Sequence, residues 1–185
     1  GFTAVARGRP TICNANPNLG LGTVCNEDTL KENGAGRPVA IRGGGPGGMQ
    51  AALVLDRRGF KPVIFEKSDR LGGSMNYACK PPHKELVADL ITTMENELKE
   101  ENVEGRLNPE ASVALVKELN PYSVIVATGG DPVRIPVPGA DGDNVYIAQD
   151  VVSGKHTFSG KKIVVVGAGV TGLETAEMLS KDNDV

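Results

Sequence analysis

A glycine pattern that occurs twice constrains the fold of this 185-residue chain more than any other feature. The pattern G-x-G-x-x-G spans residues 43–48 and again residues 167–172. Each copy follows a short apolar run and precedes apolar residues at helical spacing, which predicts a strand, a tight turn and a helix. The stretches PVAIRGGGPGGMQAALVL and KIVVVGAGVTGLETAEML repeat this arrangement. The internal repeat therefore predicts two Rossmann-like nucleotide-binding units in one α/β chain.

The three glycines of the first copy have different tasks in such a unit. Gly43 allows the tight turn, Gly45 lets a pyrophosphate approach the backbone, and Gly48 lets the helix pack closely on the strand. The helix that opens at Pro46 offers free N–H groups and the positive end of its dipole to phosphates. Glu66 ends the next predicted strand, where a carboxylate can accept hydrogen bonds from ribose hydroxyls. Together these residues predict a dinucleotide site.

Three features beside this predicted site each allow two interpretations. Arg42 occupies a position that is ordinarily apolar in a buried strand. It either reaches the phosphates or lies at an exposed strand end, and we slightly favour the exposed strand end. The small residues at 127–129 either cap a strand or allow close backbone approach to a flavin nucleotide, which we favour. The two glycines at 72–73 form either a plain turn or a backbone wall for the cofactor.

The remaining hydrophobic patterns predict alternating strands and helices. The first unit begins with a strand at 38–41, a helix at 46–58 and a strand at 61–66. A charged, amphipathic helix is expected at 83–101, with one apolar face made of Leu86, Leu90, Ile91, Met94 and Leu98. The other expected elements are a strand at 103–107, a helix at 111–119, buried strands at 122–127 and 162–166, a weak strand at 145–147 and a helix at 170–180.

Changes in composition along the chain predict three parts. Residues 1–36 are an irregular lead-in, residues 37–142 form the first unit, and residues 143–185 begin the second. Residues 131–142 are rich in proline and glycine and are expected to cross between the units. The step from Gly43 to Glu66, repeated from Gly167, passes the last residue, Val185. We therefore expect the second unit to be incomplete and the chain to be a fragment of a longer protein.

The overall composition mainly excludes other classes of function. A net charge of −3 without a long run of one sign disfavours a nucleic-acid partner. No apolar stretch reaches the roughly 18 residues of a membrane span. Three scattered cysteines (Cys13, Cys25 and Cys79) fit a reducing compartment, so we expect a cytoplasmic protein, and from the residues alone they are free thiols. No catalytic constellation stands out, as expected where a cofactor carries hydride transfer.

Four segments in order carry a resemblance to a known family. They are GGGPGGMQAALVLDRRGFKPVIFEKSDRLGG, ACKPPHK, YSVIVATGG and GKKIVVVGAGVTGLETAEML. From Thr11 to its end, the chain resembles the C-terminal half of the iron–sulfur flavoenzymes related to old yellow enzyme. That group includes 2,4-dienoyl-CoA reductase, 2-enoate reductase and trimethylamine dehydrogenase. The resemblance implies a flavoprotein with two dinucleotide-binding domains, one for FAD and one for NAD(P)H.

The resemblance also implies a function for the intact protein. Members of that family have an N-terminal FMN-binding barrel, a [4Fe-4S] cluster, and FAD and NAD(P)H domains. In their reductases, electrons pass from NAD(P)H through FAD, the cluster and FMN to an activated C=C bond. The partners implied for this chain are the nicotinamide cofactor and the missing barrel of the same polypeptide. By itself the chain is expected to be inactive, or nearly so, toward the physiological substrate.

The resemblance assigns individual residues to each cofactor. Those implied for FAD are Gly43, Gly45, Pro46, Gly48, Glu66, Lys67, Arg70, Gly72, Gly73, Ala111, Ala127, Thr128 and Gly129. Those implied for NAD(P)H are Gly167, Gly169, Gly172 and Glu174. Ser74 stands where the family usually has Gln, which puts one cofactor contact in doubt.

Cys13 is the one metal ligand that the resemblance implies. Residues 13–17 match the family's C-x-x-N-P, whose cysteine is the last cluster ligand. Alternatively, residues 9–13 match R-P-C-I-x-C with Thr11 in place of the first ligand, and we prefer the first alignment. No cysteine precedes Cys13, so a complete cluster is not expected in this chain.

Two other interpretations stay open at this point. One is the ferredoxin-reductase-like module of a glutamate synthase type of complex, although residues 11–20 speak against it. The other is a non-catalytic fragment that keeps the fold but binds no flavin.

Overall fold

A parallel sheet of four strands forms the centre of the first unit in a computed structural model of the chain. The structure describes residues 7, 13, 16, 18–20, 29–108 and 111–185. The strands are β1 (Pro38–Arg42), β2 (Lys61–Glu66), β3 (Glu104–Leu107) and β4 (Ser123–Val126), in the order β3-β2-β1-β4. All three pairings are parallel, so the carboxyl ends of the strands meet at one edge of the sheet.

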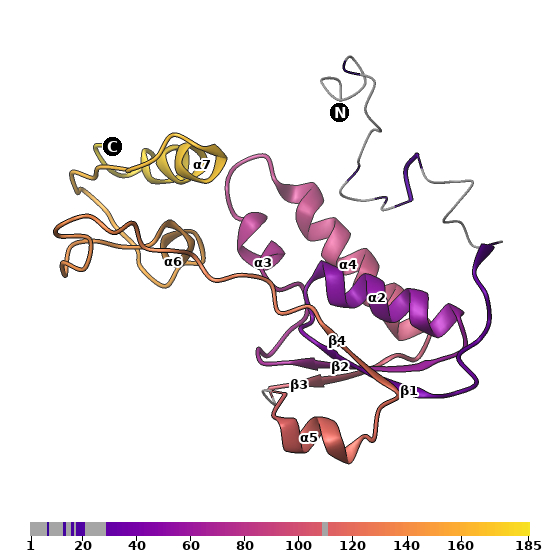
Figure 1. Ribbon diagram of the computed structural model, residues 1–185. Coiled ribbons are helices and arrows are strands. Elements are labelled where there is room, and N and C mark those ends of the chain that lie inside the picture. Colours follow the sequence, from indigo (N-terminus) through magenta and orange to yellow (C-terminus); the bar gives the residue numbers. More distant parts are fainter. Residues whose placement is uncertain (1–6, 8–12, 14–15, 17, 21–28, 109–110) are drawn as a thin grey trace.

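Helices cover both faces of this sheet (Figure 1). Helices α2 (Pro46–Arg57) and α4 (Glu85–Glu100) lie on one face, and α5 (Val113–Glu118) lies on the other. The residues of β1 and β2 alternate between the two faces, because successive side chains of a strand point in opposite directions. Ile41 and Ile64 pack against α2 and α4, whereas Ala40, Val63 and Phe65 pack against α5. Helices thus bury both faces of the sheet, which is the α/β architecture that the sequence predicts.

The second unit follows a segment without helix or strand between β4 and α6 (Ala148–Val152). Helix α7 (Val170–Leu179) packs against α6 and buries Thr175 and Leu179. The short helix α3 (Met75–Ala78) lies between the sheet and this second unit, and it contacts both α4 and α6. No helix in the described part of the chain is both long and apolar enough to cross a membrane.

Two predicted strands are absent from the structure. Residues 162–166 form no strand, and Lys162 makes only an isolated parallel bridge to Asp184. Val164 and Val166 are 82% and 78% exposed, so the expectation of a buried strand is wrong here. A parallel strand needs a hydrogen-bonded neighbour, and the described residues supply only this one bridge. The weak strand expected at 145–147 is also wrong, because this segment is irregular and leads into α6.

Strand β4 forms as predicted but is not buried. It pairs with β1 alone, and Val124 and Val126 are exposed. Ile125 points to the opposite face and packs against the cluster under α2 and α4. Helix α5 packs on β1 and β2 and leaves the α5 side of β4 uncovered by the described residues. The prediction recognised the strand correctly and misjudged its place in the sheet.

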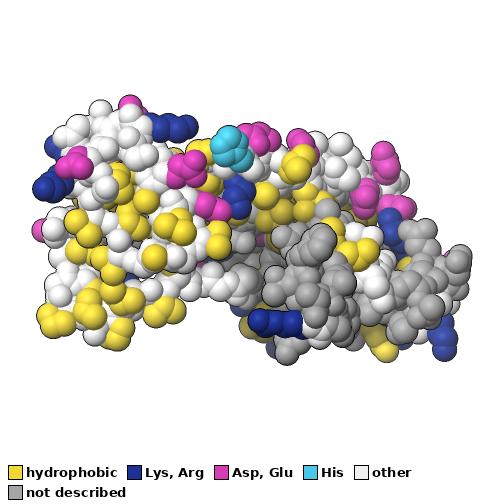
Figure 2. Space-filling view, turned by 90° about the horizontal axis from the view of Figure 1, so that it is seen from above, with side chains coloured by type: hydrophobic (Ala, Val, Ile, Leu, Met, Phe, Trp, Pro, Cys, Tyr) yellow, Lys and Arg dark blue, Asp and Glu magenta, His cyan; other side chains and the backbone are white. Residues whose placement is uncertain are grey.

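Helix α4 shows a similar partial error at its start. Ile91, Met94 and Leu98 are buried on the predicted apolar face, and Leu90 packs beside them. Leu86 is exposed although it shares the predicted face, because the first turn of α4 projects past α2. Figure 2 shows further exposed hydrophobic side chains gathered at the end of the molecule that holds α6 and α7. Val164, Val166, Val170 and Leu173 are among the exposed residues of this unit.

Replacing Leu53 should destabilise the first unit far more than replacing Leu86. Leu53 is buried between α2 and the sheet, so Leu53→Ala should lower the free energy of unfolding by about 2–5 kcal/mol. The matched change Leu86→Ala at an exposed site should alter it by roughly 0.5 kcal/mol or less. Urea titration followed by circular dichroism measures both values. Equal losses in the two variants would contradict the packing of α2 described above.

Candidate functional site

The turn between β1 and α2 reproduces the geometry that its glycines predict. Gly43 has a φ of 109°, a conformation that residues with a side chain rarely adopt. Its N–H donates to the carbonyl of Phe65 at 2.9 Å, which joins the turn to the end of β2. A Cβ at Gly43 would collide with the carbonyl oxygen of Ala127. The end of β4 therefore lies directly against the glycine turn, and only glycine permits this approach.

The other two fingerprint glycines differ in the space around them. A Cβ at Gly48 would collide with the carbonyl oxygen of Gly43, so the close packing of helix on strand requires this glycine. A Cβ at Gly45 would meet only the Cα of Gly73, at 3.9 Å. Gly45 also has an ordinary extended backbone, with φ −74° and ψ 179°. Within the described structure, Gly45 is therefore needed neither for its backbone angles nor for close packing on a neighbouring element, as expected if a ligand approaches there.

A loop after β2 is held close over the fingerprint turn. The N–H of Gly72 donates to the carbonyl of Gly44 at 2.8 Å. The side-chain amide of Asn76 donates to the carbonyl of Leu71 at 2.7 Å and packs against Gly72. Gly72 has a φ of 102°. Gly72 and Gly73 are therefore packed against the fingerprint turn beside Gly45, and their role as a wall for the cofactor stays a prediction.

Glu66 is the buried acidic group of the site, with 7% of its surface exposed. Its Oε2 accepts a hydrogen bond from the N–H of Gly44 at 2.6 Å. Its Oε1 accepts from the N–H and the hydroxyl of Ser68, at 2.9 and 2.7 Å. A carboxylate offers about four lone-pair directions, so one remains for a further donor such as a ribose hydroxyl.

These contacts hold the Glu66 carboxylate in its charged form. Burial raises the pKa of Glu66, but the hydrogen bonds from the Ser68 and Gly44 N–H groups and from the Ser68 hydroxyl lower it more. The charge of Lys67 adds to the lowering. The net result is a pKa below the ordinary value of 4.5, so the group is an anion at neutral pH.

A cavity of about 330 Å³ opens at the carboxyl edge of the sheet, beside Glu66 and the fingerprint turn. It brings together six of the residues predicted to bind FAD, which are Gly43, Glu66, Lys67, Ala111, Thr128 and Gly129. Four residues of its lining were not predicted as site residues, namely Arg42, Phe65, Gly130 and Asp131. Arg42 is exposed and also lines the cavity, so the two interpretations of this residue are compatible. Gly130 and Asp131 come directly after the small residues at 127–129, and this adjacency in the sequence could have indicated both of them.

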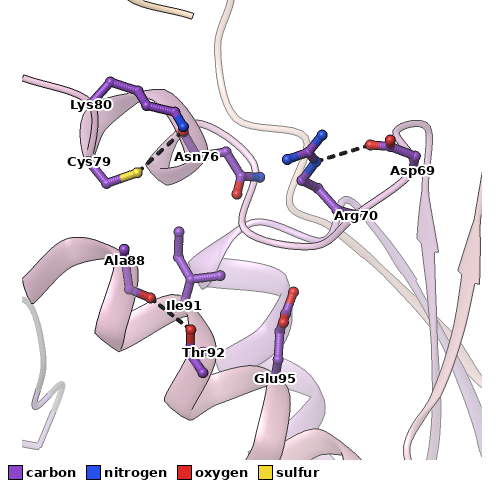
Figure 3. Close-up of a pocket in the computed structure, with 9 residues that line it drawn as sticks. All are labelled: Asp69, Arg70, Asn76, Cys79, Lys80, Ala88, Ile91, Thr92 and Glu95. Carbon is purple, nitrogen blue, oxygen red and sulfur yellow. Dashed lines mark hydrogen bonds and ion pairs between the residues drawn. The ribbon is translucent and has the colours of Figure 1, made fainter. Parts of the chain in front are cut away.

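Arg70 does not line this cavity but a neighbouring one of about 500 Å³ (Figure 3). Its Nε pairs with Asp69 at 3.1 Å, and both side chains are largely exposed. The loop and α3 contribute Asn76, Cys79 and Lys80 to one side of this cavity, and α4 contributes Ala88, Ile91, Thr92 and Glu95 to the other. The arrangement separates Arg70 from the cavity that is lined by six of the predicted FAD residues.

The second fingerprint reproduces the first one at its glycines. Gly167 has a φ of 115°. A Cβ at Gly172 would collide with the Gly167 carbonyl oxygen, just as a Cβ at Gly48 would collide with the Gly43 carbonyl oxygen. A Cβ at Gly169, which is the N-cap of α7, meets nothing within 4 Å. Glu174 pairs with Lys84 of the first unit at 2.6 Å. The turn is thus formed even though the strand before it is not.

Two of the three cysteines, including the predicted cluster ligand Cys13, lie within the described residues. Cys13 is an exposed free thiol, and Cys79 is a half-buried one whose Sγ donates to the Asn76 carbonyl at 3.4 Å. Cys25 and the alternative position Thr11 lie outside the described residues. The expectation that no complete cluster forms in this chain therefore stays a prediction.

Comparison with known proteins decides the family. The model of the pyridine nucleotide-disulphide oxidoreductase family matches residues 37–184. The chain belongs to this family. Its fold is therefore that of an FAD- and NAD(P)H-binding oxidoreductase, as the two fingerprints predict.

Individual relatives confirm the resemblance to the flavoenzymes related to old yellow enzyme. The chain is 36% identical over 172 residues to an NADH oxidase of Thermoanaerobacter brockii, covering 91% of this chain and 26% of that protein. It is 36% identical over 169 residues to a cinnamate reductase of Clostridium sporogenes, covering 91% of this chain and 24% of that protein. The solved structure of a 2-naphthoyl-CoA reductase matches with a TM-score of 0.88 at 28% identity, covering 97% of this chain and 27% of that one.

These coverages show what part of its relatives the chain represents. It spans about a quarter of the length of each of the three proteins, and within that quarter nearly the whole chain matches. The match shows that the chain belongs to an oxidoreductase family, whereas the activities and substrates of the whole relatives do not follow from it.

Replacing Glu66 by Gln should produce a stability loss that depends on pH. The pKa of Glu66 is lowered in the folded chain, so the carboxylate stabilises the fold above its unfolded-state pKa, and this contribution disappears as the pH falls through the folded-state pKa. At pH 7 the variant should lose about 1–3 kcal/mol, because an amide group cannot accept from both backbone donors. The difference should shrink as the pH falls below 4.5.

Urea titrations at several pH values measure this difference, with Glu104→Gln as the matched control. Glu104 is exposed and its ion pair within the described residues is with Arg106 two residues away, so its loss should stay below roughly 1 kcal/mol at every pH. A loss in Glu66→Gln that does not change with pH would contradict the charged network around Glu66.

Proposed function

We propose that this chain is the FAD-binding part, with the beginning of the NAD(P)H-binding part, of an NAD(P)H-dependent flavin oxidoreductase. The observation that carries this proposal is a cavity lined by Gly43 of the fingerprint turn, the buried charged Glu66 and the turn after β4, with the open Gly45 two residues after Gly43 in the same turn. Family membership supports the cofactor class. We further propose residues 37–142 as the FAD domain and 143–185 as the start of the second domain.

The residues that line this cavity, together with the adjoining start of α2, fit an FAD molecule. The N-terminus of α2 directs free N–H groups toward the space in front of Gly45, where a pyrophosphate would gain from the helix dipole. Glu66 would accept from the ribose hydroxyls through its remaining lone pair. Ala111 and Lys67, on the adjacent part of the lining, would flank the adenine side. Thr128 and Gly129 would lie along the flavin side.

The protein's part in the reaction is to bind and orient. When bound, FAD supplies the chemistry of accepting a hydride from a reduced nicotinamide and passing its electrons on. The backbone of Gly43 and Gly45 would hold the phosphates, and the fixed charge of Glu66 would hold the ribose. Gly167, Gly169 and Gly172 would open the corresponding site for NAD(P)H.

We further propose that the electron acceptor of the intact protein is an activated C=C bond of an enoate or enoyl type. The names of two relatives, a cinnamate reductase and a 2-naphthoyl-CoA reductase, support this class of substrate. The residues that would contact such a substrate belong to the FMN barrel proposed for the longer polypeptide, together with a [4Fe-4S] cluster whose last ligand would be Cys13. An assay of the intact protein with NADH or NADPH and cinnamate as acceptor tests this part.

Gly45→Val should abolish FAD binding without unfolding the chain. Gly45 already has a backbone conformation that valine adopts, and its surroundings leave room for a side chain. That side chain would occupy the place proposed for the pyrophosphate. The chain is reconstituted with FAD and desalted, and the bound flavin is measured from its absorption spectrum.

The matched control for this experiment is Gly47→Ala. Gly47 lies in the same turn, and a Cβ there meets nothing within 4 Å, so this variant should retain as much flavin as the unchanged chain. Equal flavin content in Gly45→Val and in the unchanged chain would overturn the pyrophosphate assignment. An unchanged chain that stays colourless after reconstitution would overturn the proposed function and favour a fragment that only keeps the fold.

A further inference from the structure

The segment from α3 to Lys84 contacts the second unit. Helix α3 contacts α6, and the side chain of Lys84, just beyond α3, forms an ion pair with Glu174 of α7. The Lys84 Nζ lies 2.6 Å from the Glu174 Oε1, and the two side chains are 35% and 25% exposed. The pair is thus half-buried and short, and it joins residues of different units, whereas the Arg106–Glu104 and Lys155–Asp150 pairs each lie within one unit.

The covalent connection between the units does not determine their relative orientation. Residues 127–137 contain neither helix nor strand, and most of their side chains are exposed. Val133 and Ile135 in this stretch are exposed, so hydrophobic packing does not hold it to either unit. The one side-chain hydrogen bond recorded there joins Arg134 to the carbonyl of Ala140, within the connection itself. Among the described contacts, those of α3 with α6 and of Lys84 with Glu174 join the two units and can hold their orientation.

Both ends of the ion pair are fixed within their own units. Lys84 is the N-cap residue of α4, which packs along α2, and it follows two prolines that restrict the backbone. Glu174 lies on α7, whose buried Thr175 and Leu179 hold it against α6. Because α2 and α7 each begin at a fingerprint turn, the pair relates the two nucleotide-binding turns to each other.

We infer that the Lys84–Glu174 ion pair sets the orientation of the second nucleotide-binding unit relative to the first. Glu174 then acts as a positioning residue across the two units. A fixed orientation of the two units would hold the nicotinamide in a constant direction relative to the flavin. This consequence rests on the proposed function. The orientation itself requires neither cofactor, so it can be tested on the chain alone.

Residual dipolar couplings of backbone amides in the weakly aligned chain test this inference. Strands β1 and β2 with α2 and α4 report on the first unit, and α6 with α7 reports on the second. In the unchanged chain, both sets should fit a single alignment tensor. In Lys84→Glu and in Glu174→Lys, like charges face each other, so the two sets should require different tensors.

The double variant Lys84→Glu with Glu174→Lys restores an opposite pair and should return both sets to one tensor. Lys155→Glu is the matched control, because it reverses a lysine that pairs with Asp150 inside the second unit. That control should keep one tensor. Lys84→Gln provides a milder change should a reversal prevent folding, and it should also separate the tensors.

Limited proteolysis of residues 131–142 supplies a second readout. Cleavage should be several-fold faster in the single reversals than in the unchanged chain or the double variant. The inference is overturned if either single reversal keeps one tensor with the same angle between the units, or if the double variant does not restore it. Because these readouts need no flavin, a chain that fails to bind FAD refutes the proposed function and leaves this result intact.

Discussion

The contact between the start of α2 and the turn after β1 is the constraint on which the rest of the first unit depends. The carbonyl of Gly43 lies so close to Gly48 that any side chain at position 48 would collide with it, and a side chain at position 43 would collide with the backbone of Ala127. This contact brings α2 onto the sheet, where Met49, Ala52 and Leu53 meet Ile41 and Ile64 in the core. It also leaves the N-terminus of α2 directed toward the carboxyl edge of the sheet. The same glycines thus create the core packing and the anion-binding end of the helix.

Glu66 joins this turn to the proposed ribose-binding position, although burying its charged carboxylate is electrostatically unfavourable. Burial of its carboxylate opposes ionisation, and donors from the fingerprint turn and from Ser68 more than offset this effect. Because one of these donors is the N–H of Gly44, the acidic residue also fastens the end of β2 to the turn after β1. A residue that would hold a ribose is therefore also part of the framework, which explains why its removal affects the fold as well as binding.

The sequence predicted the geometry of the fingerprint turns correctly, whereas it misjudged the burial of two strands. Six of the thirteen residues assigned to FAD line one cavity, because parallel strands bring their carboxyl ends to the same edge. Arg70 lines the neighbouring cavity instead, where it pairs with Asp69. The apolar runs that include Val126 and Val164 were expected to be buried and are exposed. An apolar run indicates a strand, but whether it is covered depends on which other segments lie beside it.

The sequence by itself determined the family, the two nucleotide turns and the central β-α-β unit. These features follow from local rules, because glycine alone allows positive φ and close backbone contact, and hydrophobic periodicity reports the element type. The tertiary structure alone decided that β4 lies at an edge, that Gly130 and Asp131 join the cavity, and that Lys84 meets Glu174. Such contacts join residues far apart in the chain, and no local pattern specifies them. They arise only when packing of the helices and strands brings the partners together.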